Sequence, residues 1–263
     1  MKVLMCEPKY FLISYEINPW MKIDNQVNVL LAYTQWKNLY HTIKDLADEV
    51  LLVEPQNKLP DLVFTANAAL IHKNIAYISH FRFNERKNES QHFNDWFIAQ
   101  GFQTVLDNKK DDYFFEGAGD ALFMGDLLFY GYGFRSDKEF HKKLTSLKPE
   151  NIILCRLTDP YFYHMDTCFC PISSDFAIWY PPAFSPEARK LIESKIELFA
   201  VPEIEAKHFA CNAVVLGKHI IMPADCPETK KHLVSKGFSV YECDVSEFIK
   251  AGGACKCLTL LLD

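Results

Sequence analysis

Apolar and polar positions alternate along this chain in a unit that recurs five times. Each copy begins with a small polar residue or a thiol and continues as an apolar run. A tight turn and a second apolar run follow, a pattern that predicts a β-hairpin. The copies occupy residues 67–78, 120–130, 166–180, 212–223 and, in truncated form, 257–262. Their opening residues lie 45 to 53 positions apart and are Asn67, Asp120, Asp166, Asn212 and Cys257.

Helical patterns lie between the hairpins, so each repeat is expected to hold strands and one helix. Ser185 as the N-cap and Pro186 in the first turn predict a helix that continues through residues 187–199. Residues 91–101 and 229–237 read as helices that end in glycine, and residues 28–46 as a longer amphipathic helix. The truncated last copy is expected to pair with the apolar N-terminal strand at residues 3–5.

Two architectures account for this pattern. One is an ordinary α/β protein whose hairpins merely look alike. The other is a closed five-bladed α/β propeller with pseudo-fivefold symmetry, in which the opening residue of each hairpin faces one central channel. Four polar side chains and a thiol at equivalent points are a poor match to a packed core, which favours the propeller. The 263 residues are then expected to form a single domain.

Composition narrows the class of protein. Apolar residues make up 49% of the chain, which favours a large core over disorder. The formal net charge is −6 and no basic cluster is present, so nucleic acid is not expected as a partner. No apolar run is long enough to span a bilayer. The short apolar start does not resemble a secretion signal, so the nine cysteines are expected to be reduced thiols in the cytoplasm. The sequence carries no signal of oligomeric state.

The candidate chemistry is concentrated near the C-terminal end. A glycine pair precedes Cys255 and Cys257, and glycine lets a backbone turn sharply and approach a ligand. His164 and Asp166 lie upstream, and Glu116 lies in a glycine-rich turn. A cysteine, a histidine and carboxylates far apart in sequence are the components of a thiol nucleophile. On an extended segment His164 and Asp166 are expected to face the same way.

Several landmarks together resemble one superfamily, the guanidino-group-modifying enzymes or penteins. The resemblance covers essentially the whole chain and rests on residues 15–21 (YEINPWM), 64–68 (FTANA), 115–120 (FEGAGD), 164–167 (HMDT) and 252–259 (GGACKCLT). It implies a five-bladed α/β propeller with a central active-site channel. The superfamily includes arginine deiminase, dimethylarginine dimethylaminohydrolase, arginine dihydrolase and the amidinotransferases. The arginine dihydrolase branch is the most similar, because it shares Ile-Asn-Pro-Trp-Met and an asparagine after Phe-Thr-Ala.

The resemblance implies a catalytic role for each landmark. Cys257 attacks the guanidinium carbon as a thiolate and forms a covalent thiouronium. His164 protonates the leaving ammonia or amine and then activates water. Asp166 and Glu116 hold the guanidinium nitrogens through charge-assisted hydrogen bonds. Asp120 orients His164 or a substrate nitrogen.

The resemblance also places residues around the amino-acid end of the substrate. Arg86 and Arg135 are candidates for binding the α-carboxylate, because a planar guanidinium suits a carboxylate. Arg82 competes with Arg86 for this role. Asn18 is expected to fix the α-amino group or to cover the site from an N-terminal loop, and Asp61 is a further site wall.

Each assignment has an alternative. Cys257 could be a structural thiol in a strand, and Glu116 could be a surface acid. Arg86 could be a solvated charge, and Arg135 could form a structural salt bridge. Cys255 is a rival nucleophile. The chain also departs from many relatives here, since they carry a third glycine and an apolar residue at positions 254 and 255.

A zinc site is the main chemical rival, with ligands from Cys168 and Cys170, Cys255 and Cys257, or His208 and Cys211. The spacing does not match a zinc knuckle, so no metal is expected. No cofactor is expected either, because the thiol and the imidazole supply the chemistry.

Three functions remain open. The first is hydrolysis of free arginine to ornithine, ammonia and carbon dioxide. The second is hydrolysis of a methylated arginine to citrulline and methylamine, or amidino transfer. The third is a non-catalytic binding propeller, like a relative that binds ribosomal subunits but lacks the cysteine and His-x-Asp. Asn67 favours the first, because an amide tolerates neutral citrulline as well as arginine where deiminases typically carry an acid.

Overall fold

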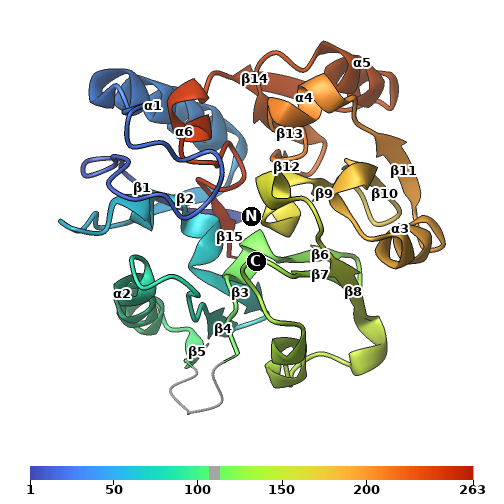
Figure 1. The fold of residues 1–263 in the computed structure, drawn as a ribbon, viewed down its shortest axis with the longest axis horizontal. Coiled ribbons are helices and arrows are strands. Elements are labelled where there is room, and N and C mark those ends of the chain that lie inside the picture. Colours follow the sequence, from blue (N-terminus) through green and yellow to red (C-terminus); the bar gives the residue numbers. More distant parts are fainter. Residues whose placement is uncertain (107–112, 263) are drawn as a thin grey trace.

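Five three-stranded sheets surround a central axis in the computed structural model, which describes residues 1–106 and 113–262 (Figure 1). In every sheet the inner and middle strands pair antiparallel, and the middle and outer strands pair parallel. A parallel pair needs a long crossover, which explains why a helical segment follows each hairpin. The sheet orders are β15-β1-β2, β3-β4-β5, β6-β7-β8, β9-β10-β11 and β12-β13-β14.

The strands are short, as expected for small blades. Their bounds are β1 Lys2–Cys6, β2 Glu49–Val53, β3 Ala69–His72, β4 Ile75–Ile78, β5 Gln103–Val105, β6 Ala121–Met124, β7 Leu127–Tyr132, β8 Ile152–Arg156, β9 Phe169–Pro171, β10 Phe176–Trp179, β11 Glu197–Ala200, β12 Val214–Leu216, β13 His219–Pro223, β14 Ser239–Cys243 and β15 Leu260–Leu261. The five-bladed α/β propeller is confirmed, and the reading of the hairpins as merely alike is excluded.

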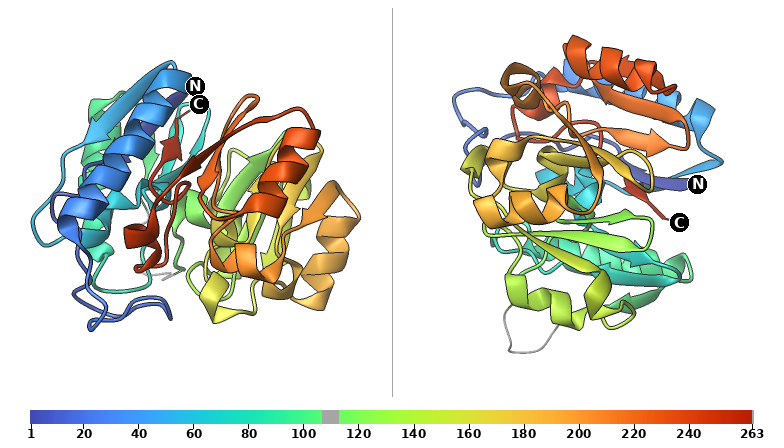
Figure 2. Two further views of the ribbon diagram at one scale, coloured as in Figure 1. Left: turned by 90° about the horizontal axis from the view of Figure 1, so that it is seen from above. Right: turned by 90° about the vertical axis from the view of Figure 1, so that its right-hand side faces the viewer.

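The two ends of the chain close the ring. Strand β15 pairs antiparallel with β1, with Leu261 opposite Val3 and Leu260 opposite Leu4. Figure 2 shows the N- and C-termini side by side. The predicted pairing of the truncated last repeat with the N-terminal strand is therefore confirmed, and the fifth blade holds both ends of the chain.

Helices lie around the outside of the ring (Figures 1 and 2). The predicted cap is present, because Ser185 accepts a hydrogen bond from the Ala188 amide at 3.2 Å. Asn28 caps α1 in the same way and accepts from the Leu31 amide at 3.1 Å. The helices are α1 Val29–Leu46, α2 Lys87–Ala99, α3 Pro186–Glu193, α4 Glu203–Lys207, α5 Pro227–Ser235 and α6 Ser246–Ile249. No helix in the described parts of the chain is long and apolar enough to cross a membrane.

The helix predicted through residues 187–199 is wrong in its second half. Helix α3 ends at Glu193, and Glu197–Ala200 forms β11 instead. This segment pairs parallel with β10 along its whole length. The inter-strand hydrogen bonds and the packing of a third strand override a helical propensity that is only a weak local preference.

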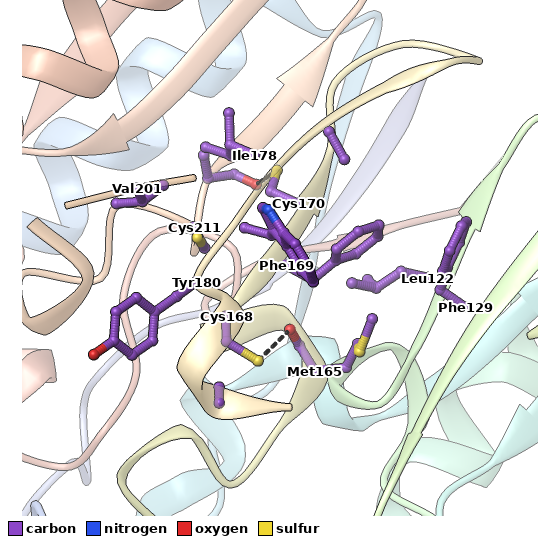
Figure 3. Packing of buried hydrophobic residues seen from close by; sticks show 14 of the residues in the cluster. Leu122, Phe129, Met165, Cys168, Phe169, Cys170, Ile178, Tyr180, Val201 and Cys211 are labelled. Carbon is purple, nitrogen blue, oxygen red and sulfur yellow. Dashed lines mark hydrogen bonds between the residues drawn. The ribbon is translucent and has the colours of Figure 1, made fainter. Parts of the chain in front are cut away.

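Apolar side chains fill the seams between blades. Figure 3 shows one seam, in which Leu122 and Phe129 face Met165 and Phe169. The Phe129 and Phe169 ring centroids are 4.8 Å apart. All nine cysteines are unpaired and buried, and most of them act as small apolar residues in these seams. The hairpin-opening residues are buried too, with Asn212 and Asp166 exposed by no more than 1%.

The ring closure is expected to depend on Leu260. Its side chain is 2% exposed and packs with Leu4, so Leu260→Ala should lower the free energy of unfolding by about 2–5 kcal/mol. The neighbouring Leu261 is only half-buried, so Leu261→Ala should cost clearly less. Urea unfolding monitored by tryptophan fluorescence measures both variants. Equal losses of unfolding free energy in the two variants would show that the packing of Leu260 does not stabilise the ring closure more than that of Leu261.

Candidate active site

One end of the central channel holds a small polar pocket that segments from several blades build. Seven of the ten predicted site residues line it: Asn18, Asp61, Asn67, Arg86, Arg135, His164 and Cys257. The other three are buried behind this lining. Glu116 and Asp166 are hydrogen-bonded to the lining residues Arg135 and Cys257, and Asp120 is hydrogen-bonded to the amide of Met165, which follows His164. The structure therefore brings all ten together.

Asn212 holds the cysteine loop in place. Its Oδ1 accepts hydrogen bonds from the backbone amides of Ala254 and Cys257, both at 3.1 Å. Its Nδ2 lies 3.1 Å from the Cys257 sulfur and donates to the Asp166 carbonyl at 3.0 Å. One buried amide thus fixes the sulfur, the loop before it and the neighbouring blade.

The glycine pair allows the loop to pass through a crowded space. Gly252 has φ of +82°, and a Cβ there would lie 2.8 Å from the Tyr163 hydroxyl. A Cβ on Gly253 would lie 2.5 Å from a ring carbon of Phe64. Both positions exclude any side chain, which explains the glycine pair in the sequence.

Cys255 does not face the pocket. It is fully buried in the apolar cluster that includes Leu39, Ile43 and Phe248 from the outer helices. Cys257 lines the pocket instead. Residues two apart would share a face on an extended strand, but the loop is not extended at this point, and strand β15 begins only at Leu260.

A buried charge network surrounds Glu116, which is fully buried and so is not a surface acid. Its Oε2 accepts a hydrogen bond from Arg135 Nη1 at 2.9 Å and lies 2.8 Å from His164 Nε2. Burial alone would raise the pKa of Glu116, but Arg135 and the hydrogen bond to His164 hold it well below its usual range. Glu116 is therefore an ionised carboxylate that aligns the imidazole.

Arg135 is fixed on both faces and at its tip. Its guanidinium lies 4.7 Å from the Phe83 ring centroid and 4.5 Å from that of Tyr163. Nη2 donates to the Ile17 carbonyl at 3.0 Å. The side chain is thereby pre-oriented at the wall of the pocket.

Arg86, rather than Arg82, lines the pocket. Arg86 pairs bidentately with Glu89 at 2.9 and 2.7 Å, and its Nη1 donates to Asn67 Oδ1 at 2.9 Å. Burial raises the pKa of Glu89 to about 7, against the opposing effect of Arg86. Arg82 is half-buried and pairs with Asp137 outside the pocket. The alternative that Arg86 is a solvated charge is excluded.

Asn67 and Asp61 form the wall beside Arg86. Asn67 Nδ2 donates to the Glu116 carbonyl at 3.2 Å, so this amide both donates and accepts in the ligand-free site. Asp61 Oδ2 accepts from the Tyr15 hydroxyl at 3.0 Å, and its Oδ1 is buried without a partner among the described residues. Burial raises the pKa of Asp61.

Asn18 fastens the N-terminal loop over the pocket. Its Nδ2 donates to the Ala251 carbonyl at 3.0 Å and to the Tyr163 hydroxyl at 3.3 Å. Its Oδ1 accepts from the Trp20 amide at 2.9 Å. The side chain therefore joins residues ahead of α1 to the loop that carries the cysteine.

The expectation that His164 and Asp166 face the same way is wrong. A 3-10 turn at Met165–Thr167 replaces the extended segment and rotates successive side chains apart. His164 lines the polar pocket, whereas Asp166 lines a separate, larger cavity. Asp166 still reaches the nucleophile candidate, because its Oδ2 accepts from the Cys257 sulfur at 3.4 Å.

Burial controls the protonation of Asp166 and Cys257. It raises the pKa of Asp166 to about 7, although Lys256 opposes the effect. Burial and Asp166 together raise the pKa of the Cys257 thiol well above its ordinary value. In the ligand-free site the sulfur is therefore a thiol.

Asp120 acts on the backbone next to His164. Its carboxylate accepts from the Ser136 hydroxyl at 2.6 Å and from the Met165 amide at 3.1 Å. Burial raises the pKa of Asp120 to about 6.

Sequence reasoning missed three further residues. Glu89 neutralises Arg86 and follows it by three residues, a spacing that brings helical side chains together. Tyr163 stacks on Arg135 and directly precedes His164. Lys256 lies beside Cys257. Among the described residues, no group of three or more His, Cys, Asp and Glu is arranged to hold a metal ion.

Comparison with known proteins extends these observations. The family model for eukaryotic N,N-dimethylarginine dimethylhydrolase matches residues 7–262. The chain is 43% identical over 265 residues to the bifunctional arginine dihydrolase/ornithine cyclodeaminase ArgZ of Synechocystis sp., covering 98% of this chain and 37% of that protein. It is 35% identical to the N(G),N(G)-dimethylarginine dimethylaminohydrolase of Mycobacterium tuberculosis, covering 97% of this chain and 84% of that protein.

A solved structure agrees over the same span. The N-terminal domain of ArgZ, as a cysteine-to-serine mutant bound to substrate, matches with a TM-score of 0.94 and 41% identity, covering 99% of this chain and 97% of that one. The chain thus spans little more than a third of the full bifunctional relative. Its sequence and its fold agree that it belongs to the dimethylarginine dimethylhydrolase family within the guanidino-group-modifying, or pentein, superfamily.

Proposed function

We propose that this protein hydrolyses the guanidino group of free arginine through a covalent thiouronium on Cys257 and carries the reaction on to ornithine, ammonia and carbon dioxide. The observation that carries the proposal is the convergence of Cys257, His164 and ionised Glu116 on one pocket that has the neutral amide of Asn67 in its wall. The residues of the ring act as one catalytic domain.

The cationic substrate activates the nucleophile. The thiol is protonated in the ligand-free site, and a guanidinium bound beside it favours the thiolate. The Cys257 sulfur attacks the guanidinium carbon while His164 gives a proton to the departing nitrogen, which leaves as ammonia. His164 then takes a proton from water, the resulting hydroxide adds to the thiouronium carbon, and the C–S bond breaks. Citrulline and the thiolate result.

In the second round the Cys257 sulfur attacks the ureido carbon of citrulline and ammonia leaves. Water then breaks the C–S bond, and the resulting carbamate loses carbon dioxide to give ornithine. Arginine and two waters then give ornithine, carbon dioxide and two ammonia, which balances the atoms. The site must hold a neutral ureide as firmly as a cation, and Asn67 suits both because an amide donates and accepts. The similarity to a protein named as an arginine dihydrolase over 98% of this chain supports this outcome.

The remaining residues bind the substrate. Asp166 and Glu116 accept from the guanidinium nitrogens, since an ionised carboxylate has room for about four hydrogen bonds. Arg135 takes the α-carboxylate, because each of its Nη atoms uses a single N–H in the ligand-free network of described residues. Arg86 assists through its remaining Nη1 proton and keeps Asn67 in place. Asn18 and Asp61 enclose the amino-acid end, and Asp120 holds the His164 backbone.

Hydrolysis of dimethylarginine is the second candidate. The family model and the 35% identical mycobacterial relative favour it. Amidino transfer needs an acceptor amine in place of water in the same pocket. A non-catalytic role is disfavoured because Cys257 and His164 are both retained.

Cys257→Ser should lower arginine turnover by at least about a thousandfold, because a serine hydroxyl is a far weaker nucleophile here. Cys255→Ser is the matched control, since Cys255 lies in the apolar cluster, and it should keep most of the activity. Mass spectrometry of ornithine, citrulline and ammonia after incubation with arginine measures both. Loss of activity in the Cys255 variant alone would transfer the role to that thiol.

Asn67→Asp should shift the product from ornithine to citrulline. A carboxylate in this wall favours the cationic guanidinium over the neutral ureide, and the Asn67 hydrogen bond to the Glu116 carbonyl would be lost. The ratio of citrulline to ornithine from arginine measures the shift. An unchanged ratio would remove Asn67 from the account of product choice.

The value of kcat/KM for arginine should rise with pH through about 7. Asp166 has a raised pKa of about 7, so below this value it is protonated and accepts poorly from a guanidinium, and above it the carboxylate is available. Deprotonation of the Cys257 thiol at higher pH raises kcat/KM further. A pH profile of kcat/KM tests this, and Asp166→Asn should remove the inflection near 7. A profile already flat across that value in the unmodified protein would contradict the assignment.

A further inference from the structure

A second cavity, the rear cavity, shares no lining residue with the polar pocket among the described residues. It encloses about 160 Å³ and is lined mainly by apolar side chains from the inner strands of all five blades, β3, β6, β9, β12 and β15. In the seam shown in Figure 3, Leu122, Phe169 and Cys170 belong to its wall. Phe123, Pro171, Val215 and Leu261 are half-buried and form its mouth.

The inner end of this rear cavity is charged. Asp166 and Lys256 are its only charged lining residues within the described chain. Asp166 Oδ2 accepts a hydrogen bond from the Cys257 sulfur at 3.4 Å, and the sulfur lines the polar pocket on the other side. A single carboxylate therefore separates the rear cavity from the candidate nucleophile.

The same carboxylate has an unused acceptor. Asp166 is 1% exposed, and its Oδ1 is buried without a hydrogen-bond partner among the described residues. A buried carboxylate oxygen without a donor is costly, so this atom offers a site for a small N–H or O–H donor. Water and ammonia are such donors and are small enough for a cavity of this size.

The proposed reaction, on which this inference rests, needs a second route. The amino-acid end of arginine fills the polar pocket between Arg135, Asn18 and the cysteine loop. Ammonia must leave and water must arrive twice if that end stays bound throughout, because citrulline that dissociates must rebind before it is carried on to ornithine. We infer that the rear cavity is the passage through which ammonia leaves and water enters while the amino acid occupies the polar pocket.

The walls of the passage select neutral molecules. Apolar strands disfavour ions, so arginine and ammonium do not enter from this side. Lys256 Nζ lies 3.4 Å from the Thr259 carbonyl. Burial lowers the pKa of Lys256, and the nearby Asp166 opposes this effect. Neutral ammonia and water meet no such barrier.

Closing the mouth tests the inference. Val215→Trp places a large ring at the mouth from β12, and Phe123→Trp does so from β6. Val240→Trp on β14 is the matched control, because Val240 is half-buried in the same sheet but does not line the cavity. Circular dichroism and thermal unfolding first establish that each variant is folded.

The readout is the product ratio together with kcat and KM for arginine. A blocked passage should lower kcat several-fold, leave KM little changed and raise the fraction released as citrulline, because the amino acid must leave before ammonia and water can exchange. Val240→Trp should match the unmodified protein in all three.

Two outcomes would overturn the inference. Unchanged kcat and product ratio in both folded mouth variants would show that exchange does not use this cavity. Equal loss of kcat in the mouth and control variants, with no change in ratio, would show only a structural effect. The unmodified protein separates these results from failure of the proposed function, because absence of both ornithine and citrulline there would overturn the function and the passage together.

Discussion

Pairing of the first and last strands closes the ring and determines the path of the segment that carries Cys257. Leu260 and Leu261 pair with β1, so the short segment before them must pass along the central axis. That segment carries Cys257, which Asn212 of the adjacent blade then holds through hydrogen bonds to its amide and its sulfur. Terminal segments are often poorly ordered, but the pairing of β15 with β1 keeps the adjacent Cys257 buried.

Around this thiol the protein buries several carboxyl groups. Glu116 and Glu89 are paired with Arg135 and Arg86, while Asp166 and Asp61 each keep a buried oxygen without a partner among the described residues. Such groups reduce the stability of the ligand-free protein and are expected at functional sites. In the proposed reaction a bound guanidinium places positive charge beside these carboxyl groups and favours the thiolate of Cys257.

The repeat made the architecture predictable. Equal phasing of the hairpins placed Asn67, Asp120, Asp166, Asn212 and Cys257 at one axis, and the polar character of four of them indicated a channel. What could not be predicted depends on contacts between segments or on turns of a few residues. A local pattern cannot show that the segment after α3 completes a sheet, that a 3-10 turn sends Asp166 to the rear cavity, or that Cys255 points into an apolar cluster. In each case tertiary packing overrides the local conformational preference of the segment.

The proposed mechanism requires a covalent bond between substrate and Cys257, which acid quenching during turnover with arginine would trap. Trypsin cleaves after Lys256 and so places Cys255 and Cys257 on different peptides, residues 251–256 and 257–263. Mass spectrometry of the quenched digest should find the thiouronium adduct on the C-terminal peptide, which carries Cys257. An adduct on the peptide that carries Cys255, or turnover with an unmodified C-terminal peptide at every quench time, would contradict the account.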